Sequence, residues 1–228
     1  MTDICFIADL HGNLPQINSC DILCICGDLV PLSVQGSTKE TKKWVRDKFI
    51  PWVDKIENIE YVLIVPGNHD LHLKEEHFSD NHKIKWIIDK KYDVISKHSD
   101  YITFYGTPWC HVFGNWAYMI SDDMLKEKFS NIPSNVDFLL THDAPYGTSD
   151  IVLQDVPWNK HEHIGNVPLR DAIIDKAPKY CIHGHLHSTN HGVEKLNNTE
   201  VICCSVVDES YELNYKPLHI FYGSENQN

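Results

Sequence analysis

Short runs of hydrophobic residues recur along the chain, and polar residues follow directly after each run. Five of these runs are nearly continuous in hydrophobicity rather than alternating, which is typical of strands that are covered on both faces. The pattern therefore predicts an α/β protein whose sheet core lies between other layers. The runs span residues 4–8, 22–26, 61–65, 136–140 and 179–182.

Helical spacing of hydrophobic residues is found between some of these runs. Residues 37–40 have the order of a capping box, and apolar side chains follow at helical intervals up to Ile56. We expect one helix here with a kink near Pro51, because proline removes a backbone donor and crowds the preceding turn. Further helices are expected over residues 84–88, 121–129 and 169–177.

The remaining apolar segments are short or alternate with polar residues, as in half-buried strands. Between them, residues 146–167 form a long segment without a periodic pattern. Long loops frequently carry function, so we expect this segment to form one wall of a pocket. Strands are expected over residues 101–106, 192–195, 201–205 and 218–222, with a hairpin turn at residues 197–198.

The run at residues 61–65 shows most clearly how polar groups follow a strand. A Pro-Gly pair breaks the strand, and Asn68, His69 and Asp70 come directly after it. Ligands of open α/β sheets bind at the carboxyl ends of the strands. An amide, an imidazole and a carboxylate at that edge therefore indicate chemistry rather than packing.

Residues that can bind a metal follow the other runs as well. Each one alone is a weak signal, because Asp-x-His or Gly-Asp most often marks a turn and a single histidine is most often a core or surface residue. Their coincidence at strand ends is much harder to explain by packing, and aspartate, asparagine and histidine are ligands of borderline divalent cations. The set comprises Asp9, His11, Asp28, Asn68, His142, His185 and His187.

Length and charge limit the size and the partners of the protein. The 228 residues suffice for one large core, so we expect one domain spanning residues 1–228, with no cap domain. The net charge of -12 disfavours binding of extended DNA or RNA and is compatible with a small anionic substrate.

The cysteines and the amino terminus indicate a cytoplasmic protein. Most of the eight cysteines lie within apolar runs and none forms a Cys-x-x-Cys pair, so we expect reduced core thiols. The chain enters a strand pattern at once, without the features of a signal peptide, and no apolar run reaches membrane-spanning length. We therefore expect no membrane association. The sequence does not indicate an oligomeric state.

Five motifs occur in a characteristic order: Asp-x-His, Gly-Asp, Gly-Asn-His-Asp, a single histidine and Gly-His-x-His. This order resembles the calcineurin-like metallophosphoesterase superfamily. The resemblance implies a four-layer α/β-β/α sandwich of two facing mixed sheets and a dinuclear metal centre. It implies one ion held by Asp9, His11, Asp28 and His187, and a second held by Asp28, Asn68, His142 and His185, with Asp28 as the bridge.

Two adjacent cations would supply the nucleophile, because a hydroxide that bridges them forms near neutral pH and can attack phosphorus in line. His69 matches the family's general acid, which protonates the leaving group. We expect Asp70 to orient the imidazole of His69 and raise its pKa. Manganese, iron, zinc and nickel all suit such ligands, and manganese is favoured for activity.

The expected substrate is a small phosphodiester. Residues 27–31 lack the Asp-Arg-Gly continuation of the superfamily's protein phosphatases, and the only arginines, Arg46 and Arg170, lie outside the motifs. A diester carries less charge than a monoester dianion and needs fewer cationic contacts. Residues 139–147, 183–187 and 203–208 also resemble the small MPPED-type metallophosphoesterases, which implies hydrolysis of cyclic nucleotides and aryl phosphodiesters.

Two other functions stay open. The first is a phosphomonoesterase or nucleotide pyrophosphatase, and the second is a non-catalytic metal-binding scaffold. The scaffold is disfavoured because the acid and every expected ligand are present.

Several residues near the motifs have more than one interpretation. We favour His183 as a buried partner behind the metal ligands over a third ligand, whereas Asp143 either orients a ligand or turns the chain. His161 and His163 fit a solvated loop better than substrate contact. Trp109 fits packing better than stacking on a base.

Overall fold

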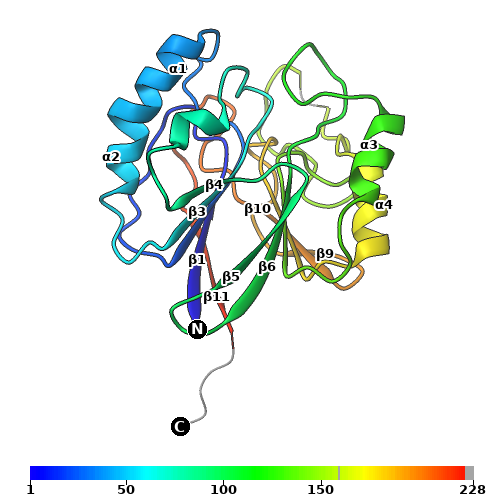
Figure 1. Ribbon diagram of the computed structural model, residues 1–228. Coiled ribbons are helices and arrows are strands. Elements are labelled where there is room, and N and C mark those ends of the chain that lie inside the picture. The colour runs from blue at the N-terminus through cyan, green and yellow to red at the C-terminus, as the bar shows by residue number, and fades with distance from the viewer. Residues whose placement is uncertain (159, 224–228) are drawn as a thin grey trace.

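Two mixed β-sheets face each other in the computed structural model, which describes residues 1–158 and 160–223 (Figure 1). The first sheet has the strand order β11-β1-β2-β3-β4, in which β11 is antiparallel to β1 and the other neighbours are parallel. Its strands are β1 (Thr2–Ile7), β2 (Ile22–Cys26), β3 (Tyr61–Val65), β4 (Ile84–Trp86) and β11 (Leu218–Tyr222).

The second sheet has the order β5-β6-β7-β8-β10-β9. Its four inner strands are parallel, and the two edge strands are antiparallel to their neighbours. The strands are β5 (Lys90–Ile95), β6 (Tyr101–Thr107), β7 (Phe138–Thr141), β8 (Tyr180–His183), β9 (Glu194–Leu196) and β10 (Thr199–Cys203).

Helices cover the outer face of each sheet (Figure 1). On the first sheet lie α1 (Thr38–Trp44), the π-helical segment η1 (Val45–Phe49) and α2 (Ile50–Val53), and on the second lie α3 (Asp122–Ser130) and α4 (Val167–Lys176). A short 3-10 helix, η2 (Glu75–Phe78), precedes β4. Within residues 1–158 and 160–223, none of the helices is long and apolar enough to cross a membrane.

Three buried clusters fill the spaces between these four layers. Phe6, Phe104 and Phe138 belong to the cluster between the sheets, while Ile7 and Phe49 belong to the cluster between the first sheet and its helices. Because neighbouring residues of β1 enter different clusters, both faces of the strand are buried and its sequence is continuously apolar. This confirms the predicted sandwich of two facing mixed sheets. All eight cysteines are buried free thiols, as expected.

Two predicted elements differ from the structure. Residues 84–88, expected to be helical, contribute β4, because Ile84 pairs with Val62 and Ile87 donates its N–H to the Ile64 carbonyl. A five-residue segment makes few intrahelical bonds, so pairing with the exposed edge of β3 prevails. The hydrophobic pattern did not predict β5, an edge strand with several charged residues.

Near Pro51, where a kink was expected, the helix contains a π-helical segment, η1, that ends two residues before the proline. Widening the turn there removes the clash between the proline ring and the preceding carbonyls. The other predicted helices and strands are confirmed, with ends that shift by a few residues.

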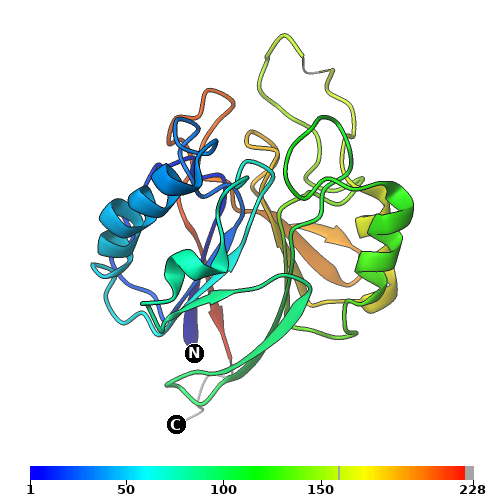
Figure 2. The ribbon, with the colours of Figure 1, turned by 45° about the horizontal axis from the view of Figure 1, so that its top comes forward.

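The two sheets are joined at their carboxyl ends. The N–H of Ala8, just after β1, donates to the carbonyl of Cys204, just after β10, at 2.9 Å, and Val206 donates back to Ala8 at 3.1 Å. The carboxyl ends of the parallel strands therefore open toward the same side, where the loops gather (Figure 2). Any side chain that follows one of these strands lies near this junction.

The two sheets approach each other closely at Gly106 of β6. A Cβ atom at this position would lie 2.6 Å from Ile87 Cγ2 and 2.8 Å from Val65 Cγ2. We expect Gly106→Ala to lower the free energy of unfolding by about 1–3 kcal/mol through overpacking, measured by denaturant unfolding. Gly36→Ala is the matched control, because no atom lies within 4 Å of its Cβ position. Equal midpoints for the two variants would contradict the close packing.

Candidate metal centre

Five strands deliver the candidate ligands to the junction of the sheets. The first sheet provides them from the loops after β1, β2 and β3, and the second sheet from the loops after β7 and β8. Parallel neighbouring strands end at the same edge, so residues far apart in sequence meet there. The ligands are Asp9 and His11 after β1, Asp28 after β2, Asn68 after β3, His142 after β7, and His185 and His187 after β8.

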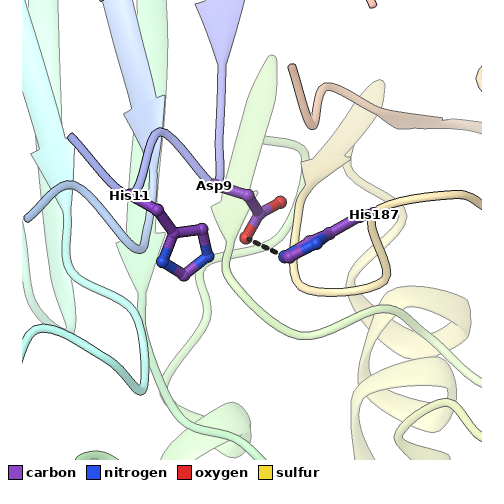
Figure 3. A group of neighbouring side chains, drawn as sticks. All are labelled: Asp9, His11 and His187. Atoms are coloured by element: carbon purple, nitrogen blue, oxygen red, sulfur yellow. Dashed lines mark ion pairs between the residues drawn. The ribbon is translucent and has the colours of Figure 1, made fainter. Parts of the chain in front are cut away.

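Two groups of donor atoms form within this set. Asp9, His11 and His187 have one donor atom each within 4.8 Å of one another, and the same holds for Asp9, Asp28 and His142. Figure 3 shows the first group, in which His187 Nε2 lies 3.8 Å from Asp9 Oδ1. The structure therefore brings together ligands from both sheets in each group.

Asp28 belongs to the second group and also lies close to His11 of the first, whereas Asp9 is common to both groups. The Oδ2 atom of Asp28 is 3.6 Å from His11 Nε2 and 3.4 Å from His142 Nε2. The Asp28 carboxylate is therefore close to one histidine of each group. The position suits the bridging role that the sequence predicts.

Asn68 and His185 both lie near His142. Asn68 Oδ1 lies 2.9 Å from His142 Nε2. The His185 ring centroid is 5.0 Å from that of His142, although His185 is not a member of either compact donor group. His185 is thus adjacent to the cluster rather than within it.

The donor atoms have the character that a divalent cation needs. Both ring nitrogens of His11 are buried without a hydrogen-bond partner, a costly arrangement that a bound cation would relieve. Burial lowers the pKa of His11 to about 3, so its imidazole is neutral and able to bind a metal. Burial is the largest influence on Asp28 and opposes its ionisation, but the nearby histidines, His142 foremost, together outweigh burial and lower the carboxyl pKa. The residues therefore fit divalent metal ions.

The backbone is strained where it carries these ligands. Asp9, His11, Asp28 and His185 have φ angles of 55°, 42°, 54° and 72°. The left-handed region costs a residue with a side chain about 1–2 kcal/mol. Strain of this kind persists only where the surrounding structure enforces it, and it concentrates at functional sites.

His142 is oriented by the turn after β2. Its Nδ1 atom lies 2.9 Å from the Cys26 carbonyl oxygen, which directs Nε2 toward Asp28 and Asn68. The ring fits because residue 27 is glycine: a Cβ atom there would lie 2.0 Å from His142 Nδ1. The Gly-Asp motif therefore makes room for a histidine of the other sheet.

His69 is attached to the metal cluster through its backbone. Its N–H donates to Asp28 Oδ1 at 2.7 Å, and its side-chain Nδ1 lies 3.0 Å from Gln35 Oε1. The ring also contacts Trp116, with centroids 4.4 Å apart, and burial lowers the pKa of His69. Because Nδ1 contacts Gln35 and His69 lines the pocket, Nε2 is the ring nitrogen that can serve a ligand.

Asp70 does not orient the His69 imidazole, and that part of the sequence prediction is wrong. Its carboxylate accepts backbone N–H groups from Leu29, Val30 and Gly67, at 2.8 to 3.2 Å. Gln35 takes the orienting position instead. Asp70 therefore fastens the loop after β2 to the loop after β3, and burial, followed by the nearby Asp28, raises its pKa to about 7.

The two residues expected behind the ligands contact other groups. Asp143 Oδ2 lies 2.9 Å from His111 Nδ1, so the carboxylate holds a histidine that sequence reasoning missed. His183 is fully buried, and its Nδ1 lies 3.0 Å from the carbonyl oxygen of Gly184. It therefore contacts the backbone next to His185 rather than the ring of a ligand.

A pocket of about 630 Å³ opens over the cluster. Apolar and aromatic side chains dominate its rim, and none of the described residues that line it is a lysine or an arginine. The loop at residues 146–167 contributes Trp158 and Ile164, so it does form part of the wall. The lining comprises Asp28, Asn68, His69, His111, Phe113, Trp158, Ile164, His185, Leu186, His187, Glu209 and Tyr211.

Three residues of uncertain role in the sequence lie outside this lining. His161 Nε2 is 3.1 Å from Asp155, and His163 Nδ1 is 2.6 Å from Asp150. Trp109 donates to Asp89 at 2.9 Å, and Lys128 stands 4.4 Å above its ring. Trp109 therefore packs against α3, whereas packing against the loop was expected.

Fold and site together define an α/β sandwich with a candidate metal centre at the carboxyl edges of two sheets. Residues 2–189 match a family model described as calcineurin-like phosphoesterase. The chain belongs to the calcineurin-like phosphoesterase family, which confirms the resemblance in its motifs.

Curated relatives include MPPED-type proteins. The chain is 34% identical to the UPF0046 protein T07D4.2 of Caenorhabditis elegans over 119 residues, which is 51% of the chain and 28% of that protein. It is 24% identical to metallophosphoesterase domain-containing protein 1 of Homo sapiens over 231 residues, covering 90% of the chain and 66% of the relative. The chain thus spans less than two thirds of the length of either relative.

Solved structures share the fold at low sequence identity. The phosphopantetheinyl hydrolase of Mycobacterium tuberculosis aligns with a TM-score of 0.55 at 12% identity, over 91% of this chain and 90% of that one. The protein TT1561 of Thermus thermophilus aligns with a TM-score of 0.56 at 11% identity, over 89% of this chain and 88% of that one. These likenesses show a common architecture.

The proximity of Asp28 to a histidine of each donor group leads to a test of metal binding. We expect Asp28→Asn to weaken Mn²⁺ binding at least about tenfold, because loss of a ligand should cost no less than loss of a supporting residue. Calorimetric titration and metal analysis after gel filtration would measure the loss. Asp93→Asn is the control, since Asp93 pairs with Lys91 on an exposed strand. Wild-type Mn²⁺ affinity in Asp28→Asn would exclude Asp28 as a ligand.

Proposed function

We propose that this protein is a metal-dependent phosphoric ester hydrolase that acts on small phosphodiesters, such as cyclic nucleotides or nucleotide-like esters. The observation that carries the proposal is the convergence of aspartate, asparagine and histidine donors from both sheets beneath one pocket, with His69 bonded to Asp28. Membership of the calcineurin-like phosphoesterase family supports the reaction class.

Two divalent cations are the proposed cofactors. One is assigned to Asp9, His11, Asp28 and His187, and the other to Asp28, Asn68, His142 and His185. When bound, such a pair lowers the pKa of a shared water and withdraws charge from phosphoryl oxygens. Manganese is the first ion to test, and iron, zinc and nickel suit the same donors.

His69 is the proposed general acid. Its Nδ1 contacts Gln35 Oε1, so the doubly protonated ring would give its Nε2 proton to the departing ester oxygen and become neutral with its remaining proton on Nδ1. The backbone bond from His69 to Asp28 fixes the acid relative to the cluster. A 1 Å displacement of a catalytic group is costly, so these two contacts set the productive geometry.

The pocket favours a diester with a planar or apolar group. None of its described lining residues is a lysine or an arginine, and the two arginines of the chain pair with Asp47 and Asp171. A phosphodiester has one negative charge, so it needs less compensation than a monoester. The exposed rings of Phe113 and Trp158 offer surfaces on which a nucleobase could stack.

The acid role of His69 predicts a dependence on the leaving group. We expect His69→Ala to lower kcat about 10²- to 10⁴-fold for a cyclic nucleotide, whose alkoxide needs a proton. The loss should be much smaller for bis(4-nitrophenyl) phosphate, whose phenolate leaves readily. The exposed His82→Ala serves as the control. Equal losses on both substrates would contradict the acid role, and a panel in which only monoesters react would overturn the diesterase proposal.

Substitution of Gln35 should affect the reaction rate, whereas substitution of Asp70 should affect stability. We expect Gln35→Leu to lower kcat up to about tenfold with unchanged stability, because one orienting hydrogen bond is lost. Asp70→Asn should instead lower the melting temperature, because both Asp70 oxygens accept backbone N–H groups and the variant replaces one of these oxygens with an NH₂ donor. Gln16→Leu, at an exposed glutamine, is the matched control. If Gln35→Leu kept the wild-type kcat, Gln35 would not orient the acid.

A further inference from the structure

We propose that His111 is a substrate-binding residue, which is held by Asp143 and donates an Nε2–H hydrogen bond to a phosphoryl oxygen. The inference rests on the proposed function, because it identifies the side chain that meets the anionic part of the ester. Neither the motif pattern nor the metal cluster includes His111.

His111 lies within the pocket but apart from the candidate ligands. It follows β6 of the second sheet and lines the pocket with Asn68 and His69, which follow β3 of the first sheet. The segment is anchored to that wall, because the N–H of Ala117 donates to the Asn68 carbonyl at 3.1 Å. The His111 side chain is 28% exposed, so its ring is accessible to a ligand.

Asp143 fixes the orientation of the ring. Its Oδ2 atom lies 2.9 Å from His111 Nδ1 and accepts the His111 backbone N–H at 3.1 Å. Asn166 donates to the same oxygen at 3.0 Å, and Ala144 donates to Oδ1 at 3.0 Å. The carboxylate is fully buried and fixed by these donors. Because Nδ1 is committed to Asp143, Nε2 is the nitrogen that can serve a ligand.

The charge of this pair suits an anionic substrate. The hydrogen bond to Asp143 raises the pKa of His111 against the effect of burial, and Asp122 acts in the same direction. His111 can therefore offer a charged donor in a pocket whose described lining contains no lysine or arginine.

The chain contains comparable pairs that lack this setting. His219 Nδ1 lies 2.8 Å from Asp3 on the exposed side of β11, and neither residue lines the pocket. A histidine beside an aspartate is therefore not a site in itself. The buried, fully bonded carboxylate and the position in the pocket distinguish His111.

The test measures binding of inorganic phosphate separately from catalysis. Protein loaded with Mn²⁺ is titrated with inorganic phosphate by calorimetry, and kcat and KM are determined with methyl 4-nitrophenyl phosphate. We expect His111→Leu to weaken phosphate binding and raise KM about 10- to 100-fold, as for loss of a charged hydrogen bond. Mn²⁺ stoichiometry should stay at the wild-type value. His111→Gln, which keeps a donor, should recover part of the affinity.

Two further variants make the outcome decisive. His219→Leu makes the same change in the exposed pair and should leave phosphate affinity and KM unchanged. If His111→Leu does not fold because Asp143 loses its partner, the isosteric Asp143→Asn takes its place and should weaken phosphate binding in the same way. Wild-type phosphate affinity in folded His111→Leu, or in Asp143→Asn when that replaces it, would overturn the proposal. Phosphate binding that depends on His111 in a protein inactive on all esters would refute the enzymatic function alone.

Discussion

The whole site depends on the backbone junction at Ala8, where the first sheet is hydrogen-bonded to the segment after β10 of the second sheet. This junction brings Asp9 next to the loop after β8, and the Asp9 carboxylate accepts the N–H of His185 at 2.9 and 3.1 Å. Neither sheet alone contains a complete donor group, since each group combines residues of both sheets. The candidate metal centre is therefore assembled when the two sheets pack against each other.

Assembling the cluster carries a large electrostatic and conformational cost. Asp9 and Asp28 are buried carboxylates, and burial raises the pKa of Asp9 although His187 and His142 oppose it. Buried charges are tolerated only when they are paired or bound to metal. Left-handed backbone at several ligands adds strain. A cation that binds the folded chain alone would offset both costs by mass action, so metal binding and stability should be coupled.

The sequence predicts which polar side chains gather at the junction of the sheets, because these residues directly follow parallel strands and the end of a strand places them almost independently of the loops. It fails for Asp70 because adjacency to His69 says nothing about which way a carboxylate points, and the backbone of residues 29–30 satisfies it instead. Gln35 lies seven residues beyond Asp28 in a loop without periodicity, so no local pattern could assign it to His69. Extending the strand-end argument to β6 would have identified His111, four residues past its last residue.

The two residues proposed to act on the substrate follow strands of different sheets, and this placement would orient a bound ester. The first sheet carries His69 after β3, whereas the second carries His111 after β6, so the proposed acid and the proposed anion contact come from opposite halves of the sandwich. The Ala117 to Asn68 hydrogen bond ties the two loops together at this point. A phosphoester held over the cluster would then have one oxygen facing His69 and another facing His111. In the proposed mechanism the scaffold would decide which oxygen leaves, because Asp28 accepts the backbone N–H of His69, Gln35 contacts the His69 ring, and Asp143 holds the His111 ring.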